Sequence, residues 1–257
     1  MAPDGDLEPP LSSLEPPPRA ELQGPSLAER ILALLEVLIC SGYPTQLALA
    51  ATFTGMGFGL FRSNGELSLT YVVVVSLSDA VLLLGLIAIF LAVHGERPRD
   101  VFIGARPSLA EALAGVPLAF VAIVIGVTTI RVVRAIAPWM QTAPENPFQS
   151  LIHTRLDLVL FIILVVVAGG VREEIQRAFL LRRFERWLGG PTIGLIVTSA
   201  SFGIGHSIQG LDAVMATGIL GAFWAVVYLR RRSVVAPVVS HAGFDLIQLV
   251  VLMTAQR

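Results

Sequence analysis

Two adjacent glutamates lie within a strongly apolar stretch of the sequence, VVVAGGVREEIQRAFLLRRFERW, which runs from Val165 to Trp187. An ionisable side chain inside a membrane-spanning helix is costly unless it faces the interior of a bundle or water, so Glu173 and Glu174 are candidates for a functional site. A carboxylate held in such a place can accept a proton as a general base. The pair therefore suggests hydrolytic chemistry.

Arg177 lies four residues after Glu173 and three residues after Glu174. On a helix both spacings bring side chains together, so the guanidinium can pair with either carboxylate. The other carboxylate would then stay free for chemistry. The alternative is an ion-pair network at a helix end without catalysis, which the neighbouring Arg172 would strengthen.

Two histidines in later apolar stretches could complete such a site. His206 follows Phe202 by four residues in FGIGH, and His241 precedes Asp245 by four residues in HAGFD. One histidine could orient a water on the glutamate, and His241 with Asp245 could stabilise the oxyanion of an attacked amide. The same side chains could instead hold a divalent metal such as zinc, with Glu173, His206 and His241 as ligands. Both alternatives stay open.

The composition is that of a membrane protein. Of the 257 residues, 54% are apolar and 14% are charged, and the mean hydropathy is +0.76. The formal net charge of −1 and the absence of a long basic run argue against nucleic acid as a partner. The single cysteine, Cys40, excludes a disulfide within the chain and a zinc site with two or more cysteines. The expected surroundings are a lipid bilayer.

Seven apolar runs are long enough to cross a bilayer as helices, each of roughly 20 residues. The first contains Pro44, so it could be kinked or form two shorter helices, and the prediction is an all-α polytopic bundle of seven to eight spans. The runs are residues 31 to 60, 71 to 93, 109 to 130, 156 to 181, 192 to 208, 211 to 229 and 234 to 254.

The chain is predicted to consist of a disordered, Pro-rich tail at residues 1–30 and one transmembrane helical domain at residues 31–257. The excess of arginine in cytoplasmic loops predicts the orientation of the domain, with the N-terminus in the cytoplasm. The arginines that this orientation places on the cytoplasmic side are Arg97, Arg99, Arg106, Arg182, Arg183, Arg186 and those at 230 to 232.

Three motifs in order resemble those of a known family. They are the glutamate pair followed by an arginine and AFL, the Phe-x-x-x-His of Phe202 and His206, and the His-x-x-x-Asp of His241 and Asp245. The resemblance is to the CPBP family, the CAAX-processing and bacteriocin-processing intramembrane proteases, which include the type II CAAX prenyl endopeptidases. It covers about residues 150–250, on three separate predicted helices.

The resemblance implies roles for the first motif. Glu173 would be the base that activates water, Glu174 its paired partner and Arg177 the structural counter-ion. The family has three residues between the glutamate pair and the arginine, whereas only two intervene here. Alignment on RAFL would instead place Arg172 and Glu173 at the glutamate positions, so the identity of the base stays open.

The other two motifs imply the rest of the site. By the same similarity, His206 would hold the water or a metal, with Phe202 as structural support, and His241 with Asp245 would form the oxyanion side. The third motif usually ends in Asn, and an ionised Asp245 cannot donate a hydrogen bond. It would have to be protonated, act as a ligand or orient the histidine. Family members are described both as metal-dependent and as metal-free glutamate proteases, so the metal also stays open.

The sequence thus predicts an intramembrane endopeptidase that cleaves a peptide or protein substrate near the cytoplasmic face of a prokaryotic cell membrane. The alternative is a non-enzymatic membrane scaffold, an immunity-type factor or a transporter. A protease requires glutamate and histidine side chains that converge around one cavity, within about 3 to 4 Å of a common point. A transporter requires a path to both sides of the membrane. The sequence gives neither the substrate nor the oligomeric state.

Overall fold

The computed structural model describes residues 24–62, 64–143 and 151–255. These residues are mostly helical, and their β-structure is limited to one isolated antiparallel bridge between Phe61 and Leu67. The predicted all-α class is confirmed. Most of the predicted disordered tail lies outside the described residues, and the first helix begins at Leu27, inside the range given to that tail.

The N-terminal part of the described chain contains a bent helix pair and a long third helix. Ser26 begins the first helix with a capping box, in which its hydroxyl accepts from the Glu29 backbone and the Glu29 carboxylate accepts from the Ser26 backbone. The first bend occurs at Gly42, whose φ of 91° is favourable for glycine and strained for other residues. These helices are α1 (Leu27–Ile39), α2 (Tyr43–Gly55), α3 (Leu69–Val93) and the short α4 (Pro98–Phe102).

The middle of the chain contains one helix that changes its winding. α6 runs directly into a π-helix, and the π-helix runs directly into α7, so the three segments form one continuous rod. The elements are α5 (Ser108–Ile136), α6 (Arg155–Leu164), the π-helix η4 (Val165–Arg172), α7 (Glu173–Trp187), α8 (Pro191–Gly205), α9 (Leu211–Arg231) and α10 (Val235–Ala255), with short 3₁₀ turns η2 (Pro138–Met140) and η5 (Ser207–Gln209).

Four of the described helices are long and apolar enough to cross a membrane: α3, α5, α9 and α10. The α1–α2 pair, bent by 42°, would be a fifth span, in agreement with the predicted kink or break near Pro44. The predicted count of seven to eight is not confirmed. The expected span at 156–181 is divided by η4 and carries charged side chains, and α8, in the expected span at 192–208, has only 15 residues.

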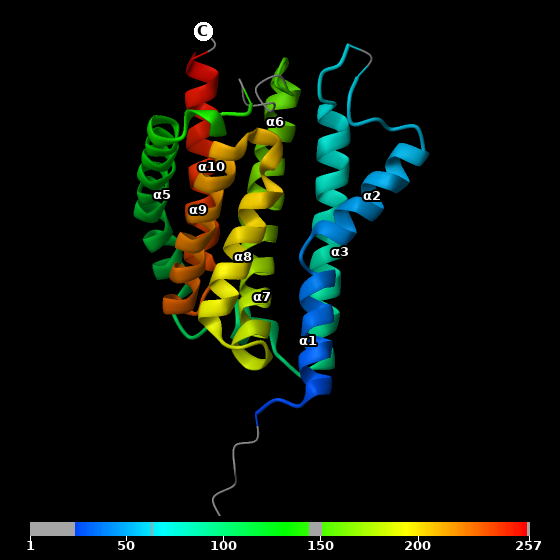
Figure 1. The fold of residues 1–257 in the computed structure, drawn as a ribbon, viewed down its shortest axis with the longest axis vertical. Helices are drawn as coiled ribbons and strands as arrows, with labels where there is room; N and C mark the ends of the chain where they lie inside the picture. Colours follow the sequence, from blue (N-terminus) through cyan, green and yellow to red (C-terminus); the bar gives the residue numbers. More distant parts are fainter. Residues whose placement is uncertain (1–23, 63, 144–150, 256–257) are drawn as a thin grey trace, which may run out of the picture.

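The helices form a bundle in which α7 lies between two groups (Figure 1). α10 packs against α5 and η4, α8 packs against α9, and α7 contacts both α8 and α1. Figure 1 also shows that α1 begins at one end of the bundle, where α3 and α7 end, whereas α10 ends at the opposite end. We call the first of these the basal end.

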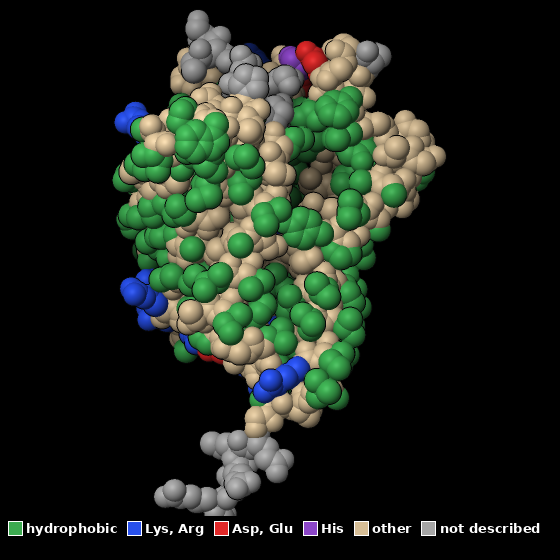
Figure 2. All heavy atoms as spheres, viewed as in Figure 1, with side chains coloured by type: hydrophobic (Ala, Val, Ile, Leu, Met, Phe, Trp, Pro, Cys, Tyr) green, Lys and Arg blue, Asp and Glu red, His purple; other side chains and the backbone are tan. Residues whose placement is uncertain are grey.

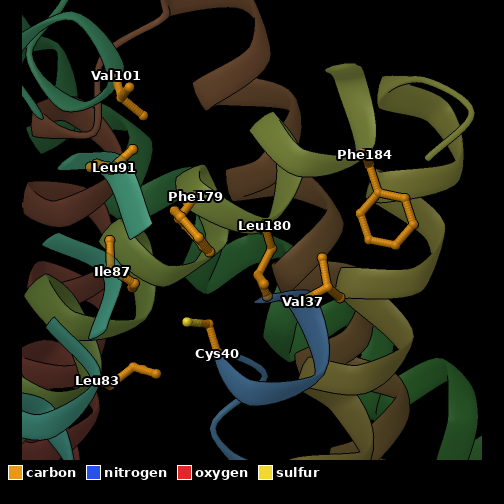
Figure 3. Close-up of a cluster of buried hydrophobic side chains, with 9 residues drawn as sticks. All are labelled: Val37, Cys40, Leu83, Ile87, Leu91, Val101, Phe179, Leu180 and Phe184. Atoms are coloured by element: carbon orange, nitrogen blue, oxygen red, sulfur yellow. The ribbon is translucent and has the colours of Figure 1, made fainter. Parts of the chain in front are cut away.

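A buried apolar cluster joins α7 to α1 and α3. Figure 3 shows side chains of these three helices and of α4 pointing toward one another around Cys40 and Phe179. The cluster consists of Val37, Cys40, Leu83, Ile87, Leu91, Val101, Phe179, Leu180 and Phe184. Apolar side chains also cover much of the outer surface, as expected for helices solvated by lipid (Figure 2).

Candidate functional site

The two glutamates are the first residues of α7, directly after the π-helix. Consecutive side chains on a helix point about 100° apart, because the helix has about 3.6 residues per turn, so the two carboxylates cannot share one environment. The Glu174 side chain is 1% exposed, whereas the Glu173 side chain is 20% exposed. The sequence pair is therefore divided into a buried and an accessible carboxylate.

Glu174 is neutralised and held from two sides. Its Oε1 forms an ion pair with Arg177 and accepts a hydrogen bond from Nδ1 of His241 at 2.8 Å. Arg177 is itself fixed, since its guanidinium carbon lies 4.6 Å from the centroid of the Phe202 ring. The sequence spacing allowed Arg177 to pair with either glutamate, and in the structure it pairs with Glu174.

Glu173 lines a cavity of about 100 Å³. Its Oε2 lies 3.8 Å from Nε2 of His241 and makes no hydrogen bond within the described part of the chain. The cavity is polar and large enough to admit water. Side chains that share this lining are Tyr43, Gln46, Arg172, Gln176, Thr198 and His206. The accessible carboxylate therefore faces the space in which a water could be activated.

His241 connects the two glutamates to α10. Its ring stacks on buried Trp224, with centroids 3.8 Å apart and planes 16° apart. Because a carboxylate can only accept, the 2.8 Å contact with Glu174 places a hydrogen on Nδ1. Nε2 then faces Glu173 at 3.8 Å and Oδ2 of Asp245 at 3.9 Å. The ring is held in one orientation by stacking and by its Nδ1 hydrogen bond.

His206 caps the end of α8 and lines the same cavity as Glu173. Its Nδ1 lies 2.8 Å from the carbonyl oxygen of Phe202, and its ring centroid lies 4.6 Å from that of the same phenylalanine. The Phe202 ring is also 6.0 Å from the His241 ring. The predicted residues thus lie in one region, with Phe202 between the two histidines.

Comparison with known proteins agrees with this arrangement. Residues 155–247 match the family model described as Rce1-like, type II CAAX prenyl endopeptidase. We call these residues, which are similar to that family, the Rce1-like segment. The recognition of a CAAX-protease-like chain from three motifs is confirmed, and the matched segment contains both glutamates, both histidines and Asp245. No curated protein and no solved structure matches the chain.

The Rce1-like segment is thus similar to a family of endopeptidases, and this similarity suggests a peptide or protein substrate at the membrane. The apolar helices agree with an integral membrane protein. The segment begins at the first residue of α6 and ends in α10. Helices α1 to α3 lie before it, yet Tyr43 and Gln46 of α2 line the same cavity.

The predicted metal ligands of the Rce1-like segment are not arranged as a metal site. Within the described residues, no three His, Cys, Asp or Glu side chains form a group that could hold a metal ion. Glu173 and His206 share the cavity, but the nearest partner of His206 Nδ1 is a backbone carbonyl. The set Glu173, His206 and His241 therefore does not fit a metal in this arrangement.

Arg172 does not neutralise the glutamates of the Rce1-like segment. It forms a buried ion pair with Asp79 of α3, and the other oxygen of Asp79 accepts a hydrogen bond of 2.5 Å from Thr45. The alternative that the glutamates belong to an ion-pair network without catalysis required Arg172 and Arg177. Arg172 is not available for it, because it pairs with Asp79. The signal in the sequence was Asp79 itself, a lone acid in an apolar run that required a cationic partner.

Two contacts that the motifs did not indicate hold the α1–α2 bend against the Rce1-like segment. The Tyr43 hydroxyl donates to the carbonyl oxygen of Ser201 at 2.6 Å, and Gln176 Nε2 donates to the carbonyl oxygen of Cys40 at 2.8 Å. Both span more than 100 residues of sequence, so local pattern could not reveal them. They fix one wall of the cavity.

A second buried charged cluster lies at the basal end of α7. Arg183, which is fully buried, pairs with Glu36 at 2.5 Å and with Glu96 at 3.2 Å. His94 Nε2 lies 2.6 Å from the other oxygen of Glu36, and Arg186 also pairs with Glu96. We call these five residues the basal ion network.

Proposed function

We propose that this chain is an intramembrane endopeptidase that hydrolyses a peptide bond near the cytoplasmic face of the membrane, with Glu173 as the general base. One observation carries the proposal. Glu173 is the member of the pair that Arg177 leaves unpaired, and it lies on a cavity beside His241. A base must keep an available lone pair and reach the water. The Oε2 of Glu173, which has no hydrogen-bond partner among the described residues, and the place of this side chain in the cavity lining support this role.

The proposed reaction begins when a water in the cavity gives a proton to Glu173 and its oxygen attacks the carbonyl carbon of the substrate. A tetrahedral intermediate with a negatively charged oxygen forms. Glu173 then returns the proton to the amide nitrogen, the C–N bond breaks, and the products are a carboxylic acid and an amine, with Glu173 again a carboxylate. Proton transfer by a positioned side chain contributes roughly 10²- to 10⁴-fold to such a rate.

His241 supports the proposed stabilisation of the oxyanion. With one hydrogen on Nδ1 directed at Glu174, a second proton on Nε2 gives an imidazolium that can donate to the oxyanion. Asp245, 3.9 Å from Nε2, can balance the positive charge of that ring and needs no proton of its own for this. His206, which lines the same cavity, would orient the attacking water.

The test is cleavage of a defined peptide by the purified protein in nanodiscs. The probe is a fluorogenic peptide that ends in a farnesylated CAAX sequence, and the same peptide without the prenyl group is its control. We expect cleavage by the wild type and at least a hundredfold lower kcat for Glu173→Gln. Mass spectrometry of the products identifies the cleaved bond.

A matched control separates chemistry from stability. Glu185 lies on the same helix and pairs with Arg232 at the basal end, away from the cavity. Glu185→Gln should keep the wild-type kcat. Failure of the wild type to cleave either peptide, or full activity of Glu173→Gln, would overturn the proposal and favour a scaffold or transporter.

A further inference from the structure

The winding of the helix changes immediately before the glutamate pair. η4 has eight residues in π geometry between two α-helical segments. Such turns are rare, are mostly limited to one turn and often occur at functional sites. Gly169 and Gly170 lie inside this π-helix, where glycine is less favourable than alanine. Both the π geometry and the two glycines make this segment unfavourable as an isolated helix. A tertiary contact must therefore stabilise it.

That contact is with α10. A Cβ atom on Gly170 would lie 2.8 Å from the Cβ of Ala242 and 3.4 Å from its backbone N and Cα. A Cβ on Gly169 would lie 2.8 Å from Oδ2 of Asp245. The first distance is shorter than a normal carbon–carbon contact, and the second is shorter than a normal carbon–oxygen contact. At these two positions α10 therefore packs directly against the backbone of a glycine.

Both α10 residues in this contact follow His241 closely in sequence. Ala242 is the next residue, and Asp245 follows one helical turn later. The height and rotation of α10 on η4 therefore determine where the imidazole points. A shift of about 1 Å would break the 2.8 Å hydrogen bond to Glu174 and change the 3.8 Å approach to Glu173.

We propose that Gly169 and Gly170 form a slot in the π-helix that sets the register of α10, and thereby positions His241 and Asp245 against the two glutamates. The two glycines are positioning residues, since they act through α10 and touch no reacting atom. The inference rests on the proposed function, because the geometry that it protects is that of the proposed hydrolysis.

A pair of complementary substitutions tests the slot. Gly170→Ala adds a methyl group against Ala242, and Ala242→Gly removes the methyl group that it meets. We expect Gly170→Ala to lower kcat for the farnesylated peptide by roughly ten- to hundredfold with KM within about twofold, because misplacement of catalytic groups by about 1 Å has effects of this size. The double variant Gly170→Ala with Ala242→Gly should recover at least a third of the wild-type kcat.

Two further variants complete the design. Gly85→Ala on α3 adds a methyl group where no atom outside its own helix lies within 4 Å, so it should leave kcat unchanged. Gly169→Ala pushes against the carboxylate of Asp245 and should lower kcat while it leaves KM within about twofold. Gly169→Ala is therefore a second test of the slot if Gly170→Ala does not fold.

Thermal unfolding of the wild type, of Gly170→Ala, of Ala242→Gly and of the double variant separates the slot from the proposed function. If the wild type cleaves no peptide, the proposed function fails, and the slot is judged by whether Ala242→Gly restores the unfolding midpoint that Gly170→Ala lowers. Strictly additive effects on the midpoint would overturn the slot. An unchanged kcat for Gly170→Ala in an active protein would also overturn it, since the contact would then be packing alone.

Discussion

The two buried charged clusters on α7 differ in how completely their charges are neutralised. In the basal ion network, Glu36 and Glu96 are both paired with arginines, and Arg183 joins them. At the site, Glu174 is paired with Arg177, whereas Glu173 forms no ion pair with an arginine in the described residues. One helix thus carries a neutralised and an incompletely neutralised cluster, more than two and a half turns apart between Glu173 and Arg183.

The surroundings of the clusters explain this difference. The basal ion network adjoins the apolar cluster around Phe179, where an unpaired charge would be very unfavourable (Figure 3). The site adjoins a polar cavity, where Glu173 retains partial contact with solvent. The types of the charged residues alone do not distinguish a structural ion-pair network from a candidate catalytic site. The feature that supports a catalytic role is an incompletely neutralised carboxylate beside a cavity, as at Glu173.

The largest effect is expected when the two glutamates are exchanged for glutamine one at a time. Glu173→Gln should lower kcat by roughly 10²- to 10⁴-fold. It should change the thermal midpoint little, because the pairing that it weakens is the 3.8 Å approach to His241 Nε2. Glu174→Gln should lower both, because Arg177 and His241 lose their buried partner. Equal loss of stability in the two variants, measured by thermal unfolding, would contradict the division of the pair.

Removal of the central arginine tests the basal ion network. Arg183→Leu leaves Glu36 and Glu96 without their buried partner and should destabilise the protein by about 3–5 kcal/mol. Chemical unfolding in detergent measures this. Arg182→Leu is the control on the same helix, since its side chain is 33% exposed and approaches Glu96 only to 3.8 Å. A loss of similar size in the control would show that charge number rather than burial matters.

His206 gives an intermediate effect on activity. Its Nδ1 is engaged by the Phe202 carbonyl, so only the other ring nitrogen is available to a water in the cavity. We expect His206→Gln to lower kcat about tenfold, which is less than the loss for Glu173→Gln. The reason is that His206 would orient the water but would not accept its proton. Steady-state kinetics on the farnesylated peptide compares the two. A larger loss for His206→Gln would reverse their assigned roles.

The smallest effect concerns pH and the pair of Glu185 with Arg232, beyond the predicted span that ends at residue 181. Two hydrogen bonds of 2.6 Å from the arginine lower the pKa of Glu185. A carboxylate with a lowered pKa stabilises the folded state above its usual pKa of about 4.3 and loses this contribution as pH falls through the lowered value. Glu185→Gln should thus cost about 0.2–1 kcal/mol at neutral pH, with a difference from wild type that shrinks in acid. A difference independent of pH would exclude this ion pair as its source.

The sequence was sufficient for the helical class, the break near Pro44 and the residues of the three motifs. These depend on local hydropathy and on short spacings. The sequence did not determine which glutamate Arg177 binds, because both helical spacings permit a contact and the choice depends on His241, 67 residues away. The pairing of Arg172 with Asp79 across 93 residues was equally inaccessible.

The number of spans could not be counted from apolar length alone. The run at 156–181 has the length of a span, but the structure winds part of it as a π-helix and uses charged side chains for buried pairs. α8 is apolar but ends at Gly205, because the chain turns there to place His206 at the cavity. In both places the chain is helical as predicted, and the structure adds the change of winding in one and the position of the helix end in the other.

The cavity wall supplied by the α1–α2 bend has a consequence for how this protein could diversify. The groups that would carry the reaction lie in the Rce1-like segment, residues 155–247, whereas Tyr43 and Gln46, which line the same cavity, precede that segment by more than 100 residues. The two parts of the lining can therefore change separately in evolution. We expect homologues to keep the reaction and to acquire new substrates by exchange of the first two helices, and chimaeras that swap this part should inherit the preference of the donor.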